Sequence, residues 1–262
     1  MATSGEINAV KMREDERFGY GAPRIAPENL DNVLFHLLQT TTAPPRLAGS
    51  MLLIHETMDP VREARRAWQY NPGQRRLRRS PNVAYDTPAV ASDGLRTHDQ
   101  MDTFSGTLDR YEWKLTGKRE LYVPANSYAL HAEKVRYKDI VRKNHLNPEL
   151  PRYELRRCWV VDATLKAGAT HLYRRRTFYV DEDSWQIVAV DLYDNRDQIW
   201  RVQETHTIQA WDRLYSFPVA ETVYDLETAR YLVQALSNED PEATSRTFES
   251  GYFDPANVSK TR

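Results

Sequence analysis

The chain has 262 residues, a hydrophobic fraction of 40%, a charged fraction of 28% and a formal net charge of −1 at pH 7. A net charge this close to zero argues against a nucleic-acid-binding or membrane-surface protein. The one cysteine, Cys158, excludes an intrachain disulfide and a cysteine-based metal site. The mean hydropathy of −0.70 is low for a compact globule, and a sheet with one face in water would produce it.

Residues 1–26 are polar and contain several Gly and Pro, which predicts a weakly ordered arm or an edge strand. The spacing of apolar residues then predicts a helix over 27–38, which Pro44 and Pro45 would end. The apolar positions of this helix are Leu30, Val33, Leu34, Leu37 and Leu38. The N-terminal stretch lacks the apolar core of a signal peptide, so we expect a soluble, untargeted chain or a fragment of a longer secreted protein.

Beyond Pro45 the apolar pattern changes to a period of two, which predicts strands. Consecutive strands are expected within 47–58, 61–72 and 73–81, with a turn at Asn71-Pro72-Gly73. Residues 81–109 show no clean period. A segment of this length without a pattern is typical of a binding loop, a lid or short helices.

The rest of the chain reads mostly as strands that are joined by short turns rich in Asp and Asn. A short helix is expected at 136–142, and 226–236 could be a strand or a helix. The expected strands are 110–127, 151–168, 170–180, 185–193, 198–209 and one or two within 215–236. The last residues, 241–262, form a polar tail.

This order predicts an antiparallel meander of about nine or ten strands, because short turns between neighbours force antiparallel pairing. The simplest layout is a single curved sheet, which would form one domain over 27–240. We therefore expect an α+β, mainly β fold, packed around at least the helix at 27–38.

Aromatic residues recur in the predicted strands, and two interpretations are open. The first is a plain core between the sheet and its helix, because aromatic residues favour strands and dominate cores. The second is an apolar groove for a lipid-like ligand, since a wide curved sheet needs something to fill its concave face. The candidate lining residues are Trp68, Tyr70, Trp113, Trp185 and Trp200.

Two basic stretches, RRLRRSP at 75–81 and RRR at 174–176, raise the question of a nucleic-acid site. Strand alternation places Arg174 and Arg176 on one face and Arg175 on the other. Acidic residues are as numerous as basic ones, so cross-strand ion pairs on a wet face are the better interpretation. We expect no nucleic-acid partner.

The loop SDGLRTHDQMD offers an acid–base group of Asp93, His98, Asp99 and Asp102, but it has no firm metal-ligand spacing. The chain also lacks an HExxH motif, a GxSxG motif and a phosphate-cradling Gly loop. Cys158 is expected to be a buried structural thiol, because no partner base lies near it in sequence. We therefore predict no catalytic residue, no metal and no cofactor.

Several long stretches resemble a bacterial family of unknown function that is similar to the outer-membrane lipoprotein-sorting proteins (LolA/LolB-like). They are PPRLAGSMLLIHETMDPVREARRAWQYNPGQRRLRRSPNVAYD at 44–86, SDGLRTHDQMDTFSGTLDRYEWKLTGKRELYVP at 92–124, RYELRRCWVVDATLKAG at 152–168, RRRTFYVDEDSWQIVAVDLYDNRDQIWRVQE at 174–204 and ETVYDLETARYLVQALSNED at 221–240. The resemblance implies a strongly curved antiparallel sheet, an incomplete barrel with helices on its concave side. It also implies a periplasmic or outer-membrane-associated location and a link to RND-type envelope transporters. It supplies no catalytic residues.

These observations predict a non-enzymatic periplasmic carrier or chaperone that binds a lipid, a lipoprotein acyl chain or another apolar ligand in the concave face of the sheet. One alternative is an accessory or scaffolding protein for an envelope transporter, with no small ligand. Another is an enzyme that uses the Asp93/His98/Asp99/Asp102 loop. An open sheet edge would also allow a homodimer.

Overall fold

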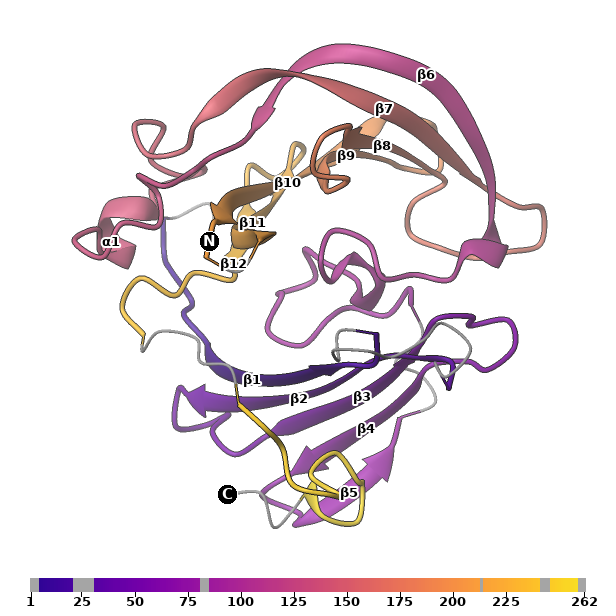
Figure 1. Ribbon diagram of the computed structural model, residues 1–262, viewed down its shortest axis with the longest axis vertical. Helices are drawn as coiled ribbons and strands as arrows, with labels where there is room; N and C mark the ends of the chain where they lie inside the picture. Colours follow the sequence, from indigo (N-terminus) through magenta and orange to yellow (C-terminus); the bar gives the residue numbers. More distant parts are fainter. Residues whose placement is uncertain (1–4, 21–30, 81–84, 213, 241–245, 259–262) are drawn as a thin grey trace. The chain divides into compact units, whose positions relative to one another are not determined.

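The computed structural model describes residues 5–20, 31–80, 85–212, 214–240 and 246–258. Backbone contacts divide the chain into two compact units. The seven-stranded unit comprises Met1–Asn8 and Tyr85–Ala243, and the five-stranded unit comprises Ala9–Ala84 and Thr244–Arg262. Each unit contains one antiparallel sheet (Figure 1).

The sheet of the five-stranded unit is a simple meander in the order β1-β2-β3-β4-β5. Its strands are β1 (Lys11–Phe18), β2 (Val33–Ala43), β3 (Met51–Thr57), β4 (Arg66–Asn71) and β5 (Arg76–Arg79). The turn between β4 and β5 is held by Asn71, whose side-chain oxygen accepts the N–H of Gly73 at 2.9 Å. This confirms the turn that the sequence predicts.

The core of the five-stranded unit joins this sheet to the last part of the chain. Leu38 and Leu53 lie opposite each other on β2 and β3 and are fully buried. Phe253 and Val258 pack against them in the same cluster. The C-terminal stretch that reads as a polar tail therefore contributes apolar residues to this core.

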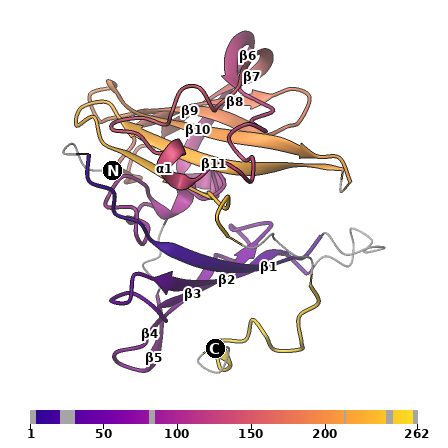
Figure 2. The ribbon, with the colours of Figure 1, turned by 90° about the vertical axis from the view of Figure 1, so that its left-hand side faces the viewer.

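The seven-stranded unit contains the remaining strands in the order β12-β11-β10-β9-β8-β7-β6, so each strand pairs with its neighbour in sequence (Figure 2). The strands are β6 (Tyr111–Pro124), β7 (Tyr153–Leu165), β8 (Arg175–Asp181), β9 (Ile187–Tyr193), β10 (Ile199–Ala210), β11 (Tyr215–Asp225) and β12 (Tyr231–Gln234). Its helices are short: α1 (Tyr137–Ile140), η2 (His98–Gln100) and η3 (Leu108–Arg110). Nowhere in the described ranges does a helix reach the length and apolarity needed to cross a membrane.

One face of the seven-stranded sheet, the covered face, is defined by a row of residues that lie opposite one another on neighbouring strands. The row runs through Trp113, Ala163, Arg176, Leu192 and Arg201 on β6, β7, β8, β9 and β10. Side chains at such paired positions point to the same side of a sheet. Ala163, Arg176, Leu192 and Arg201 are all buried, so this face is packed rather than wet.

The opposite face of the seven-stranded sheet carries polar pairs beside buried apolar residues such as Val160. Tyr179 donates to Asp191 at 2.8 Å, and Arg175 donates to Asp197 at 2.8 Å. Arg176, the next residue along β8, is buried on the covered face. Arg175 and Arg176 therefore lie on opposite faces, as the predicted alternation requires. The prediction that this opposite face is wet was wrong, because its residues Cys158 and Val160 are 0% and 3% exposed.

The predicted helix over 27–38 was wrong where the structure describes it. Residues 27–30 lie outside the described part of the chain, and Val33–Leu38 are the first half of β2. Leu37 and Leu38 point to opposite faces of this strand, yet their exposures are 1% and 0%. A strand that is buried on both faces has consecutive apolar residues, and these cannot be told from a buried helix by periodicity.

The predicted layout of one strongly curved sheet with helices on its concave side was also wrong. The described strands form two sheets, neither of which closes or curls strongly. The only α-helix within the described ranges, α1, has four residues. The mainly β, antiparallel character is confirmed, and 226–236 contains strand β12 rather than a helix.

Candidate functional site

The site lies where an irregular stretch, Leu95–Thr107, packs on the covered face of the seven-stranded sheet. We call this stretch the covering segment. It folds on itself through short-range polar bonds: the Thr97 hydroxyl donates to Asp99 at 2.5 Å, and the Thr97 N–H donates to the side chain of Gln100 at 2.9 Å. Local side-chain bonds of this kind replace regular secondary structure, which explains why the sequence shows no period here.

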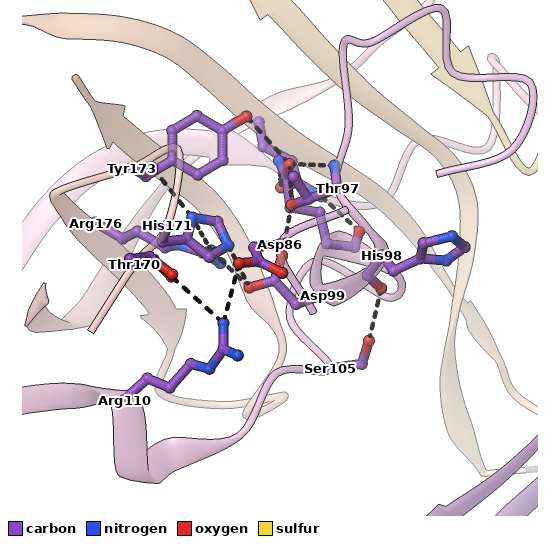
Figure 3. Close-up of polar contacts among 12 residues, drawn as sticks. Asp86, Thr97, His98, Asp99, Ser105, Arg110, Thr170, His171, Tyr173 and Arg176 are labelled. Carbon is purple, nitrogen blue, oxygen red and sulfur yellow. Dashed lines mark hydrogen bonds and ion pairs between the residues drawn. The ribbon is translucent and has the colours of Figure 1, made fainter. Parts of the chain in front are cut away.

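A buried ion pair attaches the covering segment to β8. The carboxylate of Asp99 lies 2.6 Å from the guanidinium of Arg176 and 3.2 Å from Nε2 of His171. Figure 3 shows Asp99 beside Arg176 and His171, with the ring of His98 pointing away from them. Burial by itself would raise the pKa of Asp99, but Arg176 and His171 outweigh it and lower that pKa. Asp99 is therefore an anion at neutral pH.

The ring of His171 contacts three groups of this buried cluster. The N–H of Tyr173 donates to Nδ1 of His171 at 3.0 Å. Nε2 of His171 lies 2.8 Å from the guanidinium of Arg176 and 3.2 Å from the carboxylate of Asp99. His171 therefore packs against both members of the ion pair.

Amide and hydroxyl groups extend the attachment to β10. The side chain of Gln100 donates to the side-chain oxygen of Gln203 at 3.0 Å and accepts from the hydroxyl of Tyr173 at 3.1 Å. Arg201 donates to the carbonyl of Leu95 at 3.0 Å and pairs with Asp225 on β11. These buried groups need such partners, because an unpaired one would cost about 1–3 kcal/mol.

The other end of the covering segment places one aromatic ring on an aromatic surface. The ring centroid of Phe104 lies 5.2 Å from that of Phe178 and 5.6 Å from that of Trp113. Trp113 also stacks on Phe178 at 5.7 Å. A Cβ added at Gly106 would lie 2.8 Å from the Phe104 ring, so a glycine is needed there for the ring to approach.

The backbone just before Phe104 is strained. Asp102 and Thr103 have φ values of 47° and 70°, in the left-handed region that non-glycine residues seldom adopt. The hydroxyls of Thr103 and Thr205 form a buried hydrogen bond that holds this turn on β10. Such strain is of order 1–3 kcal/mol per residue and concentrates at ligand clamps and switch regions.

The structure separates the five predicted lining residues. Trp113 and Trp200 both contact the aromatic cluster of the covered face, because Trp200 packs at 5.8 Å from Tyr173. Trp185 is 69% exposed in the turn before β9. Trp68 and Tyr70 belong to the core of the five-stranded unit.

The acid–base group named from the loop does not form a shared site. Asp93 pairs with Arg230 at the surface, and Asp102 is exposed. Asp99 is buried against Arg176, and His98 points away from it (Figure 3). Among the described residues, no group of three or more His, Cys, Asp and Glu side chains could hold a metal ion.

The partners of Asp99, namely Arg176 and His171, were not predicted from the sequence, and neither was Phe104. One feature of the sequence did set Arg176 apart: strand alternation placed it on the opposite face from Arg175. No signal in a single sequence links Arg176 to a residue 77 positions away.

The fold and the site define a class: a mainly β protein of antiparallel sheets, one of which has an aromatic face covered by an irregular segment of its own chain. A domain from Vibrio parahaemolyticus that is named as an outer membrane lipoprotein-sorting protein has this fold, with a TM-score of 0.53 and 12% identity over 86% of this chain and 77% of that one. A DUF1329 family protein from Desulfovibrio piger matches with the same TM-score, 13% identity, and coverage of 86% and 80%.

The chain belongs to the DUF1329 family of proteins of unknown function, which matches residues 1–259. It is 49% identical over 228 residues to the uncharacterized protein PA3922 of Pseudomonas aeruginosa, and this alignment covers 87% of the chain. The chain spans 50% of the length of that relative. The family resemblance that the sequence motifs indicate is confirmed.

Proposed function

We propose that the chain is a non-enzymatic carrier or chaperone of the periplasm or outer membrane, which holds a lipid, a lipoprotein acyl chain or another apolar ligand on the covered face of the seven-stranded sheet. In this proposal Trp113 and Trp200 line the binding surface, and the covering segment moves to admit the ligand. The likeness in fold to a lipoprotein-sorting domain supports this class of function.

The observation that carries the proposal is the contact of Phe104 with Phe178 and Trp113. A single ring on an irregular segment covers an aromatic surface that is otherwise built from strands. An acyl chain could replace that ring and bury about the same apolar area.

The energetics allow such an exchange. Each methylene that is buried contributes roughly 0.8 kcal/mol. Moving Phe104 forfeits the burial of one ring, about 1.5–3 kcal/mol. It also releases the strain at Asp102 and Thr103. The ion pair of Asp99 and Arg176 can stay intact, because it anchors the far end of the covering segment.

The experiment is to lock the covering segment with a disulfide. The hydroxyls of Thr103 and Thr205 are in contact, so the double variant T103C/T205C brings two thiols together. Cys158 is buried and should not interfere. Binding of a fluorescent fatty acid is measured for the oxidised and the reduced form. We expect the oxidised form to bind at least about tenfold more weakly, a difference of 1.4 kcal/mol.

The single variant T103C, treated with the same oxidant, is the control for oxidation and for the loss of the threonine hydroxyl. It should bind equally before and after treatment. Equal binding by the oxidised and reduced double variant would contradict a movable cover. No saturable binding by the untreated chain would contradict the carrier itself.

A second candidate is an accessory protein for an envelope transporter of the RND type, and one observation favours it. The edge strand β6 exposes Leu115 at 60% and Tyr122 at 73%, and Leu155 on the adjacent β7 is 56% exposed. An edge strand with exposed apolar side chains can pair with another chain. The same edge could join two copies of this chain.

Light scattering tests the homodimer directly. If β6 is the contact, the wild-type chain should be dimeric at high concentration and the variant L115K/Y122K monomeric. A wild-type chain that stays monomeric would remove the dimer. A transporter as partner would then be supported only if it binds the wild-type chain and not L115K/Y122K.

A further inference from the structure

Four basic side chains form one continuous row across the five-stranded sheet. Arg17 on β1 lies opposite His36 on β2, His36 lies opposite His55 on β3, and His55 lies opposite Arg66 on β4. Residues that are paired in this way point to the same face of a sheet. We call this set the basic row.

The members of the basic row are in close contact. Arg17 donates to Nδ1 of His36 at 2.8 Å, and the ring centroids of His36 and His55 are 4.2 Å apart. The carbonyl of Phe253 accepts a hydrogen bond from Nε2 of His55 at 2.8 Å. Since Nδ1 of His36 accepts a bond, the proton of the neutral His36 ring sits on Nε2.

At neutral pH the permanent charges of the basic row are those of Arg17 on β1 and Arg66 on β4, with the two neutral histidines between them. Burial is the largest cause, and together with His55, Arg17 and Arg66 it lowers the pKa of His36 to about 4. Two acidic groups lie near the row: Asp254 acts on His55, and Glu63 lies 3.3 Å from Arg66 at the surface.

The basic row lines a groove of about 350 Å³ within the five-stranded unit. Its wall contains aromatic rings as well as the basic groups: His55 lies 4.8 Å from Trp68, and Arg17 lies 5.2 Å from the ring of Phe253. The lining residues are Arg17, His36, His55, Arg66, Trp68, Gly251, Phe253, Asp254 and Pro255. An anion here would receive donors from several strands at once.

We propose that this groove binds a phosphate group, with Arg17 and Arg66 donating from its two ends and His36 donating between them. A guanidinium donates in a fork that matches two oxygens of one anion. Two arginines on opposite sides therefore need an anion with more than two oxygens, which favours a tetrahedral phosphate over a carboxylate. The phosphate can be free or part of a lipid headgroup. The proposal does not depend on the carrier function of the other unit.

The test is a titration of the full chain, followed through the imidazole resonances of its histidines by NMR. Three soluble probes are compared: inorganic phosphate, glycerol 3-phosphate and a short-chain phosphatidic acid. We expect saturable shifts of His36 and His55 with at least one of them. Binding of inorganic phosphate would identify a free phosphate site, and binding of the other two alone would identify a headgroup site.

The variants R17Q and R66Q should each lower the affinity for the probe by about tenfold or more, because each removes a charge-assisted pair of hydrogen bonds. Both side chains are exposed, so folding should persist, and thermal unfolding of each variant verifies it. R78Q is the matched control, because Arg78 is an exposed arginine of β5 outside the row.

R78Q should bind as the wild type does. R17K and R66K keep the charge but lose the forked donor geometry of a guanidinium. Their affinity for the probe should therefore lie between those of the wild type and the glutamine variants. The proposal would be overturned by the absence of saturable shifts with all three probes, or by an equal loss of binding in R78Q.

Discussion

Asp99 is the residue on which the attachment of the covering segment depends most. In the variant D99N, Arg176 would stay buried without its counter-ion, and a buried charge that loses its partner costs about 3–5 kcal/mol. We expect the free energy of unfolding to fall by this amount, as measured by urea titration at pH 7. D93N is the control, because the exposed pair of Asp93 and Arg230 should contribute less than about 1 kcal/mol. Similar losses in the two variants would contradict the assigned role.

The same ion pair predicts a pH dependence. The pKa of Asp99 is lower in the folded chain than in the unfolded chain, so its stabilisation is fully present above the ordinary pKa of an aspartate. It is lost as the pH falls from about 4 toward the lower folded-state value. The difference in unfolding free energy between wild type and D99N should therefore narrow below about pH 4. A constant difference down to pH 2 would contradict this.

At the residue scale, the sequence indicated the chemistry of the site without its geometry. Asp99 and His98 were named together because they are adjacent in the chain, yet only Asp99 joins the buried network. Trp113 and Trp200 were correctly placed in strands, but so were Trp68 and Tyr70, which pack in a different sheet. Which strands share a sheet depends on long-range pairing, and a single sequence does not contain that information.

At the scale of elements, the C-terminal stretch 246–258 acts as the cover of the five-stranded sheet. Phe253 packs in one cluster with Leu38 and Leu53 and is only 3% exposed. F253A should therefore lower the free energy of unfolding by about 3–5 kcal/mol. V61A is the matched control, because Val61 is 74% exposed and its truncation should change stability by less than about 0.5 kcal/mol.

Hydrogen exchange locates the effect of F253A. Faster exchange should appear in β2 and β3, whose residues contact Phe253. Unchanged protection of these strands would contradict the role of the C-terminal stretch as their cover.

Strands were predicted far better than the one long helix. The turns at Asn71 and Asp194 and the period of two were sufficient to identify β3 to β10, because turn chemistry is local. The segment 33–38 failed because both faces of β2 are buried, which removes the polar residues that mark a strand. The segment 81–109 was predicted to be irregular, and this is correct for 85–107. The buried hydrogen bonds and ion pair that join it to β8 and β10 were not predicted.

For the whole molecule, the balance of 36 basic and 37 acidic residues has a direct consequence in solution. The sequence pI is about 6.7, so the net charge almost vanishes near neutral pH. Proteins with little net charge associate and precipitate more readily. We expect the solubility of the purified chain to be lowest near pH 6.7 and to rise on both sides, as measured by precipitation with ammonium sulfate. A solubility that falls steadily from pH 6 to pH 8 would contradict this.

The single-domain prediction for 27–240 stays a prediction, although backbone contacts divide the chain into two units. Sequence reasoning could not find this division because the five-stranded unit is discontinuous: Ala9–Ala84 and Thr244–Arg262 flank almost the whole of the other unit. No shift of composition marks a boundary of this kind.

This discontinuity constrains the order of events during synthesis. The ribosome releases β1 to β5 early, whereas Phe253 and Val258 emerge only after the entire seven-stranded sheet has been made. Until then Leu38 and Leu53 lack their partners Phe253 and Val258, and nascent apolar strands in that condition are prone to aggregate. Newly made chains should therefore need a holding chaperone until Phe253 and Val258 have left the ribosome.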